Sequence, residues 1–204
     1  MAVSFFVIED HSLTNLGVRE SLQNNTDFTC AGFAYTEAEA FEKLTELSLI
    51  GKLPSVIILD LLLGEDNGID ILREVSKHFP AVKIVVYSMY ANPGIVSLAL
   101  ESGAKGFVSK SSSERELIRA IEKLAAGETY VQESLIAPLS TYKNLIASLT
   151  RAEMTVLNAV IERKTFEQIS EETELPVTSV ENYLKRIFAK TGCKNHEELI
   201  AQFG

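Results

Sequence analysis

The chain has 204 residues, of which 46% are hydrophobic, and a formal net charge of −9 at pH 7. This length suits one large or two small globular domains, and the hydrophobic content excludes an intrinsically disordered chain. The acidic balance argues against nucleic-acid binding driven by total charge, and the longest apolar runs are too short to cross a membrane.

The cysteines and the N-terminus indicate a compartment. Cys30 and Cys193 lie far apart without metal-like spacing, and the first residues do not form a secretion signal. Free thiols are typical of a reducing environment, so we expect the protein in the cytoplasm.

The first 127 residues alternate short β-branched runs with helical patterns. We expect strands at 4–8, 28–34, 56–60, 83–88 and 106–109. The expected helices lie near 13–24, 37–48, 68–79, 93–102 and 113–126. Alternation of this kind predicts an α/β, flavodoxin-like, doubly wound five-stranded parallel sheet covered on both faces. Helix-start signals are a cap at Thr36, a proline at Pro93 and a capping box formed by Ser113 and Glu116.

The pattern changes after Gly127. We expect a first domain at 1–127, a linker with one short helix at 128–147, and a second domain at 148–204. Residues 148–204 show only helical patterns, each opened by a Thr or Asn three residues before Glu or Gln. The four start signals are Thr150 with Glu153, Thr165 with Gln168, Thr178 with Glu181, and Asn195 with Glu198. They predict a small all-α four-helix domain that contains a helix-turn-helix.

Polar side chains follow four of the expected strands. Glu9 and Asp10 end the first strand, Asp60 the third, Ser88 the fourth and Lys110 the fifth. Ligands gather at the carboxyl ends of parallel strands, and three carboxylates tolerate one another only beside a cation. Each residue alone has an ordinary structural explanation, but their coincidence at successive strand ends indicates a site for Mg²⁺ and phosphate.

The chemistry of that site follows from its groups. With Mg²⁺ bound, the Asp60 carboxylate can attack phosphorus and form an acyl phosphate. Mg²⁺ and Lys110 would neutralise the phosphoryl oxygens, and Ser88 could donate a hydrogen bond to them. A hydrolytic enzyme is a distant alternative, because no Cys or His accompanies the site; we treat the three histidines as incidental: His11, His78 and His196.

The third expected helix of the second domain, 178–191, has two faces. The side chains expected to pack inward are Val180, Tyr183, Leu184, Ile187 and Phe188. The candidate DNA contacts are Ser179, Glu181, Asn182, Lys185, Arg186, Lys190 and Lys194. Asn182, Lys185 and Arg186 suit base edges in the major groove, whereas Lys190 and Lys194 suit phosphates. Glu181 is favoured as the cap partner of Thr178, with cytosine N4 as its alternative partner.

These motifs carry a family resemblance. Val7-Ile8-Glu9-Asp10-His11, Ile57-Ile58-Leu59-Asp60 with Asn67-Gly68, Val85-Val86-Tyr87-Ser88 and the run from Gly103 to Lys110 look like a two-component receiver domain. The run from Leu149 to Leu157, with the run from Ser179 to Ile187, looks like a LuxR-type helix-turn-helix. Over essentially its full length the chain resembles a NarL/FixJ-family response regulator.

The resemblance implies roles for these residues. It implies phosphorylation of Asp60 by a sensor histidine kinase, with phosphoryl contacts from Ser88 and Lys110. It makes Phe107 an aromatic switch that turns inward as Ser88 engages the phosphoryl group. The implied Mg²⁺ ligands are Glu9, Asp10, Asp60 and the backbone carbonyl of Leu62.

The chain departs from the family pattern at three places. Leu63-Gly64 followed by Glu65-Asp66 stands where Met-Pro is usual, and Phe107 replaces the common Tyr. Ser111 replaces a proline that follows the lysine through a cis bond. A cis non-proline bond costs about 3–4 kcal/mol. We nevertheless expect a cis Lys110–Ser111 bond, because Lys110 has to be aimed at the pocket.

We therefore expect a cytoplasmic transcription regulator that is not an enzyme, that is controlled by Mg²⁺-dependent phosphorylation, and that binds DNA as a homodimer on activation. One alternative is a DNA-binding regulator that never responds to phosphate. Another is a phosphorelay or protein-interaction module whose acidic helical domain binds protein. A steep salt dependence of binding would favour DNA over a protein partner.

Overall fold

The computed structural model describes residues 3–64 and 66–203, so that Glu65 lies outside the described residues. The chain divides into two compact units, one formed by Met1–Ala91 with Ile95–Leu135 and the other by Asn92–Gly94 with Ile136–Gly204. Among the described residues, no helix combines the length and apolar character that a membrane span needs.

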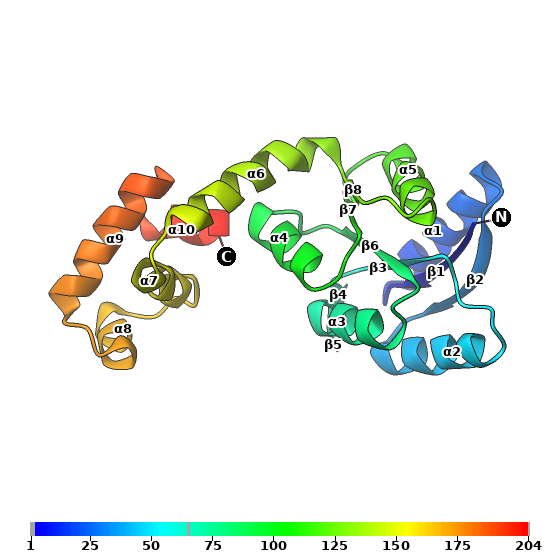
Figure 1. Cartoon of the computed structure of the whole chain (residues 1–204), viewed down its shortest axis with the longest axis horizontal. Helices are drawn as coiled ribbons and strands as arrows, with labels where there is room; N and C mark the ends of the chain where they lie inside the picture. Colours follow the sequence, from blue (N-terminus) through cyan, green and yellow to red (C-terminus); the bar gives the residue numbers. More distant parts are fainter. Residues whose placement is uncertain (1–2, 65, 204) are drawn as a thin grey trace. The chain divides into compact units, whose positions relative to one another are not determined.

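The first unit is built on a parallel sheet in the order β2-β1-β3-β6-β7-β8 (Figure 1). Its strands are β1 (Ser4–Ile8), β2 (Thr29–Ala34), β3 (Val56–Leu59), β6 (Lys83–Ser88), β7 (Gly106–Ser109) and β8 (Tyr130–Val131). The loop after β3 contains a short antiparallel pair, β4 (Leu62–Leu63) and β5 (Asp66–Asn67). The expected doubly wound α/β fold is confirmed, with one strand more than expected, because β8 comes from the segment interpreted as a linker.

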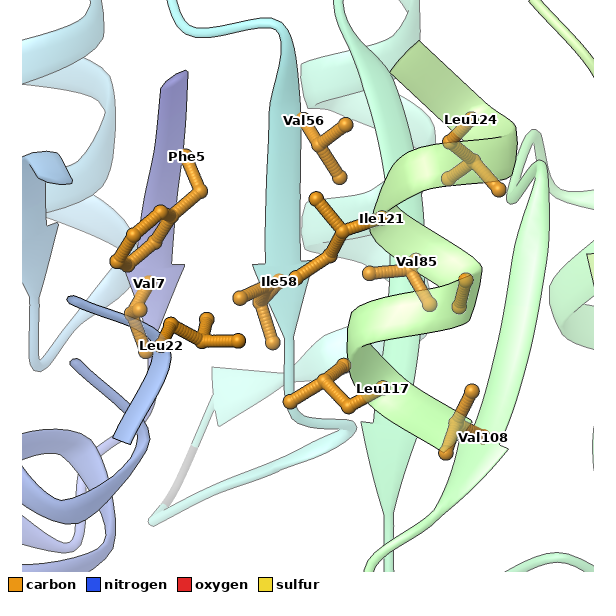
Figure 2. Close-up of a cluster of buried hydrophobic side chains, with 11 residues drawn as sticks. Phe5, Val7, Leu22, Val56, Ile58, Val85, Val108, Leu117, Ile121 and Leu124 are labelled. Carbon is orange, nitrogen blue, oxygen red and sulfur yellow. The ribbon is translucent and has the colours of Figure 1, made fainter. Parts of the chain in front are cut away.

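In the described part of the chain, five helices flank the sheet: α1 (Ser12–Asn25), α2 (Glu37–Leu49), α3 (Gly68–His78), α4 (Pro93–Glu101) and α5 (Glu114–Ala125). Side chains that alternate along the buried strands face α1 and α5 on one side, as Figure 2 shows. The labelled members of this cluster are Phe5, Val7, Leu22, Val56, Ile58, Val85, Val108, Leu117, Ile121 and Leu124. Because the strands are buried on both faces, polar chemistry is confined to their ends.

Helix starts in this unit follow the sequence signals only in part. The Thr36 hydroxyl accepts a hydrogen bond from Glu39 N, and α4 begins at Pro93, as expected. The capping box expected at Ser113 is wrong, because the Ser113 side chain makes no capping bond. The Glu116 carboxylate instead accepts a hydrogen bond from the Tyr130 hydroxyl at 2.5 Å. Strand β8 thus supplies the partner that the sequence motif assigned to the helix itself.

The second unit is helical. Helix α6 (Glu133–Ser148) begins in the first unit, and α7 (Arg151–Ile161), α8 (Phe166–Thr173), α9 (Val177–Thr191) and α10 (His196–Phe203) follow. Leu145, Ile146 and Leu149 pack against the buried core of this unit. That core consists of Val156, Leu157, Ala159, Val160, Ile169, Val180, Leu184, Ile187, Cys193, Leu199 and Phe203. The 128–147 segment therefore holds a strand and most of a 16-residue helix, α6, where a linker with one short helix was expected.

Three of the four start signals in this unit form. Both hydrogen bonds of the capping boxes at Thr150 and Thr165 are present, and the Asn195 side chain accepts a bond from Glu198 N. The box expected at Thr178 is wrong, because α9 begins one residue earlier with Pro176 as its N-cap. With Pro176 at the N-cap and Val177 as the first helical residue, Thr178 already lies inside the first turn, where its side chain does not cap the helix.

Candidate functional site

A lysine bridges two buried carboxylates at the carboxyl end of the sheet. Lys110 Nζ lies 2.5 Å from Glu9 Oε2 and 2.6 Å from Asp60 Oδ2. The side chains of both acids are 4% exposed and that of Lys110 is 11% exposed. These residues follow β7, β1 and β3, so the parallel register brings together positions 101 and 50 residues apart in the chain.

The lysine is held in its charged form. Burial lowers the pKa of Lys110, but hydrogen bonds to Asp60 and Glu9 raise it by more, and the net pKa lies above its ordinary value. The resulting stabilisation is complete below pH 10.5 and is lost only as pH rises through the raised pKa. Two carboxylates that converge on one ammonium form a pocket for positive charge.

A second group of donors lies beside this bridge. The ligand atoms of Glu9, Asp10 and His11 all lie within 4.8 Å of one another, a group that does not include Asp60. His11 Nδ1 is 2.9 Å from Asp10 Oδ1 and 3.3 Å from Glu9 Oε1. His11 was interpreted as incidental from the sequence. Its position directly after two acids was the signal that could have identified it.

The oxygen donors suit a hard divalent cation. Mg²⁺ is usually held by one or two carboxylates, carbonyl or water oxygens and phosphate oxygens. Glu9, Asp10 and Asp60 supply carboxylates at one edge of the sheet, and Leu62 follows in β4, where it pairs with Asn67. The donor set therefore fits Mg²⁺, and the ammonium of Lys110 already marks the place where positive charge is stabilised.

In the second unit, α8 and α9 form a helix-turn-helix. Glu174 adopts the left-handed conformation with a φ of 56°, and the Ser170 hydroxyl donates to Leu175 O at 2.6 Å across the turn. On α9 the residues expected to pack inward are buried or half-buried: Val180, Tyr183, Leu184, Ile187 and Phe188. On its other face Ser179 is half-buried, and the exposed side chains are Glu181, Asn182, Lys185, Arg186 and Lys190. A shallow hollow of about 140 Å³ lined by Ser179, Asn182, Tyr183 and Arg186 opens on that face.

Lys190 and Lys194, the two lysines expected to contact phosphates, differ in their surroundings. Lys190 Nζ donates to Glu153 Oε2 at 2.6 Å and to Ser148 O at 2.9 Å, and the Glu153 side chain is 2% exposed. Lys194 is exposed. The ammonium expected near phosphate at position 190 therefore ties α9 to the start of α7.

Two known protein families match this chain, one in each of its two parts. The model of the response regulator receiver domain matches residues 5–122, more than half of the chain, and that of the bacterial regulatory proteins of the luxR family matches residues 147–203. The chain belongs to the response regulator receiver family. Its C-terminal part belongs to the luxR family of regulatory proteins, so that the protein is a response regulator with a LuxR-type helix-turn-helix.

Individual relatives cover nearly the whole response regulator. The DNA-binding transcriptional activator DevR/DosR of Mycobacterium tuberculosis is 26% identical over 96% of this chain and 91% of that protein. The response regulator protein VraR of Staphylococcus saprophyticus is 22% identical over 98% of this chain and 95% of that protein. A structure of two RcsB dimers bound to two parallel DNAs has the same fold, with a TM-score of 0.79 at 24% identity over 99% of this chain and 98% of that chain.

The expected cis bond in the receiver is wrong. Among the described residues every peptide bond is trans, including Lys110–Ser111. Lys110 N donates to Ser88 O at 2.9 Å, and Ser112 N donates to Ser109 O at 3.0 Å in the turn that follows. The strand ladder therefore already directs Lys110 at the two carboxylates, and a cis bond costing about 3–4 kcal/mol is not needed.

The remaining receiver residues singled out from the sequence lie inside the sheet. Ser88 is 0% exposed at the end of β6 and pairs with Ser109 in β7. Phe107 is also 0% exposed, in the middle of β7. The ring expected to turn inward on activation is therefore already in the inward position.

One positioning residue escaped the sequence analysis. Asn15 of α1 is 0% exposed, and its Nδ2 donates to Glu9 O at 3.1 Å and to Ala34 O at 3.3 Å. Its Oδ1 accepts a hydrogen bond from Arg19 Nε. Asn15 thus fixes the end of the strand that presents Glu9. The seven-residue spacing from Asn15 to the buried Leu22 places both on one helix face, and this spacing was the signal that could have identified it.

The buried pair in the helix-turn-helix unit gives a pH prediction. The hydrogen bond from Lys190 and the one from Thr150 N lower the pKa of Glu153 to about 2. A depressed carboxyl pKa stabilises the folded unit fully above the ordinary value of 4.5, and this stabilisation disappears as pH falls towards 2. We expect the unfolding temperature of this unit, measured by calorimetry, to decrease as the pH is lowered from 4.5 to about 2.

Two glutamine variants make this test specific. Glu153→Gln should be less stable at pH 7 and should lose less stability than the wild type on acidification. Glu171→Gln, an exposed change in the same unit, should follow the wild type. Equal acid sensitivity of Glu153→Gln and the wild type would contradict the assigned pKa.

Proposed function

We propose that Asp60 is the phospho-acceptor of this response regulator and that a sensor histidine kinase is the donor. The single observation that carries the proposal is the ammonium of Lys110 held between Glu9 and Asp60. An Asp60 oxygen forms the new bond to phosphorus, while the bond from phosphorus to the donor imidazole nitrogen breaks and leaves its electron pair on that nitrogen. The proposed role is regulation rather than turnover of a substrate.

We assign the Mg²⁺ ligands to Glu9, Asp10, Asp60 and the Leu62 carbonyl. When bound, Mg²⁺ supplies positive charge that offsets the oxygens of the incoming group. Lys110 shifts from the Asp60 oxygen to a phosphoryl oxygen, and the Ser88 hydroxyl donates to another. Phe107, which pairs with Val86 in β6, is the proposed switch residue, and because its ring is already buried the proposed change is a shift of its backbone.

We propose that residues 148–204 bind DNA with α9 in the major groove, that 1–127 form the receiver domain and that 128–147 link them. The proposed base contacts are Ser179, Glu181, Asn182, Lys185 and Arg186, with Lys194 on phosphate. Lys190 is assigned to Glu153 rather than to phosphate, because its ammonium already has two acceptors. The relative DevR/DosR is a DNA-binding activator, and RcsB dimers are found on DNA.

Activation is proposed to pair two such domains in a homodimer, whose α9 helices would meet half-sites one DNA turn apart. The proposed compartment is the cytoplasm, where the two free thiols, Cys30 and Cys193, stay reduced.

Solution mass tests the phosphorylation switch. Light scattering with Mg²⁺ and beryllofluoride, a stand-in for the phosphoryl group, should convert a wild-type monomer into a dimer. Asp60→Asn should remain at its starting mass, because the attacking carboxylate oxygen is gone. An equal response of Asp60→Asn and the wild type would contradict Asp60 as the acceptor, and no response of either would favour the phosphate-independent regulator.

Salt dependence tests the DNA interface. Lys194→Ala should weaken binding to duplex DNA of mixed sequence and reduce the slope of log affinity against log salt by about 0.9, the value for one phosphate contact. Lys164→Ala is the matched control, because Lys164 is engaged by Glu162 and Glu172 at 2.6 Å. A wild-type affinity that does not vary with salt would favour a protein partner instead.

A further inference from the structure

The segment that joins the two parts of the response regulator begins as a strand of the receiver sheet. Strand β8 pairs in parallel with β7, with Tyr130 opposite Gly106 and Val131 opposite Phe107. Tyr130 N donates to Lys105 O and Gln132 N donates to Phe107 O, each at 3.0 Å. Figure 1 shows β8 beside β7 and α6 following it. The chain therefore leaves the receiver from the strand that carries Phe107 and Lys110.

One side chain extends this ladder beyond its backbone. Gln132 Oε1 accepts a hydrogen bond from Ser109 N at 2.9 Å, in the position that a further backbone carbonyl would occupy. Its Nε2 donates to the hydroxyl of Ser134, in the first turn of α6, also at 2.9 Å. A single amide thus connects the residue before Lys110 with the helix that leads into the LuxR-type domain.

The end of β7 is held from both sides. Lys110 N donates to Ser88 O in β6, and the neighbouring Ser109 N is bound by Gln132. Ser109 is 6% exposed, so that without Gln132 its N–H would be buried without this partner, which is costly. Any shift of Lys110 towards a group on Asp60 has to be accommodated by these two bonds.

The burial of Phe107 favours the backbone of β7 over the Phe107 ring as the part that responds to Asp60. The ring is already fully buried, so further burial cannot report the state of Asp60. The Phe107 carbonyl, by contrast, accepts a bond from Gln132 N. A backbone shift in β7 would act directly on β8.

We propose that Gln132 is a positioning residue for Lys110 and that the β7–β8 ladder transmits the state of Asp60 to α6. The inference rests on the proposed phosphorylation of Asp60. As Lys110 moves onto the phosphoryl group, the bond from Ser109 N to Gln132 weakens and β8 loosens. Coupling between two sites is reciprocal, so removal of this bond favours the phosphorylated state.

Hydrogen exchange on the wild-type protein tests the loosening without any substitution at β8. With Mg²⁺ and beryllofluoride, deuterium uptake should become faster in a peptide that covers 128–135, which contains the amides of Tyr130 and Gln132. The peptide that covers β2, on the far edge of the sheet, is the internal control. Unchanged or slower uptake in 128–135 overturns the proposal.

Beryllofluoride affinity tests the reciprocal effect. Gln132→Ala should bind beryllofluoride about 5-fold more tightly than the wild type, the ratio that corresponds to the net contribution of one hydrogen bond. Ser134→Ala keeps the Ser109 bond and should bind like the wild type, as should Gln23→Ala, an exposed change on α1. Equal or weaker binding by Gln132→Ala overturns the proposal.

The two measurements together distinguish a failure of the phosphorylation site from a failure of the β7–β8 ladder. Wild-type protein that binds no beryllofluoride, or binds it equally as Asp60→Asn, contradicts the proposed function. Wild-type protein that binds it through Asp60, while 128–135 and Gln132→Ala show no change, contradicts the ladder alone.

Discussion

Replacement of Lys110 by methionine should leave the receiver markedly less stable without metal. Glu9 and Asp60 would keep their burial but lose the ammonium that lies within 2.6 Å of both. Breaking a buried ion pair by removing one partner typically costs about 3–5 kcal/mol, because the remaining charge is uncompensated. We therefore expect a decrease of this size in the free energy of unfolding of the receiver, measured by calorimetry in the presence of a chelator.

Magnesium should restore part of that loss. A divalent cation supplies the charge that Lys110 provided, so that Mg²⁺ should raise the unfolding temperature of Lys110→Met more than that of the wild type. Lys105→Met is the matched control, since Lys105 is exposed and precedes the same strand. An equal loss of stability in the two variants would show that the bridge contributes little.

Replacement of Gly68 by alanine should disturb the loop after Asp60. A Cβ at this position would lie 2.4 Å from Leu61 Cα and 2.5 Å from Leu61 O, closer than non-bonded atoms approach. The clash is with backbone, so the loop has to move rather than a side chain. We expect a loss of about 1–3 kcal/mol in receiver stability and weaker Mg²⁺ binding, because Leu61 lies between Asp60 and Leu62.

The chain offers a glycine control for this change. Gly17 lies within α1, and a Cβ there would meet nothing within 4 Å. Gly17→Ala should stabilise the receiver by about 0.5–1 kcal/mol, because alanine has the higher helix propensity. Urea unfolding of the two variants makes the comparison. A stabilising Gly68→Ala would contradict the close approach.

The receiver site was largely predictable because strand ends obey a general rule. Glu9, Asp60 and Lys110 each follow a buried apolar run, and parallel strands bring such positions to one edge. Asn15 was not predicted, because its spacing from Leu22 indicates only a buried helix face, and the two strand ends that its side chain reaches are visible only in the folded structure. The cis bond was wrongly expected, because the sequence does not show that Lys110 N continues the ladder to Ser88.

Most of the other differences between the expected and the observed structure involve residues that are far apart in the sequence. Strand β8 has two residues and shows no periodicity, so only its pairing with β7 reveals it. The bond between Lys190 and Glu153 joins residues 37 apart on different helices, which helical spacing does not predict. The Thr178 motif failed for a local reason, because Pro176, two residues before Thr178, is the N-cap of the helix.

The bridge at Lys110 also has a kinetic consequence. Its contact with Glu9 closes a loop of 101 residues, whereas the contact of Lys190 with Glu153 spans 37. Contacts between distant residues slow folding, because chain entropy is lost before they form. The ribosome delivers the receiver first, but its acceptor pocket forms only after Lys110 has emerged. The helical unit is synthesised last, but its contact spans fewer residues and should form faster. The delay between completed folding of the receiver and completed folding of the helical unit is therefore shorter than the delay between their synthesis.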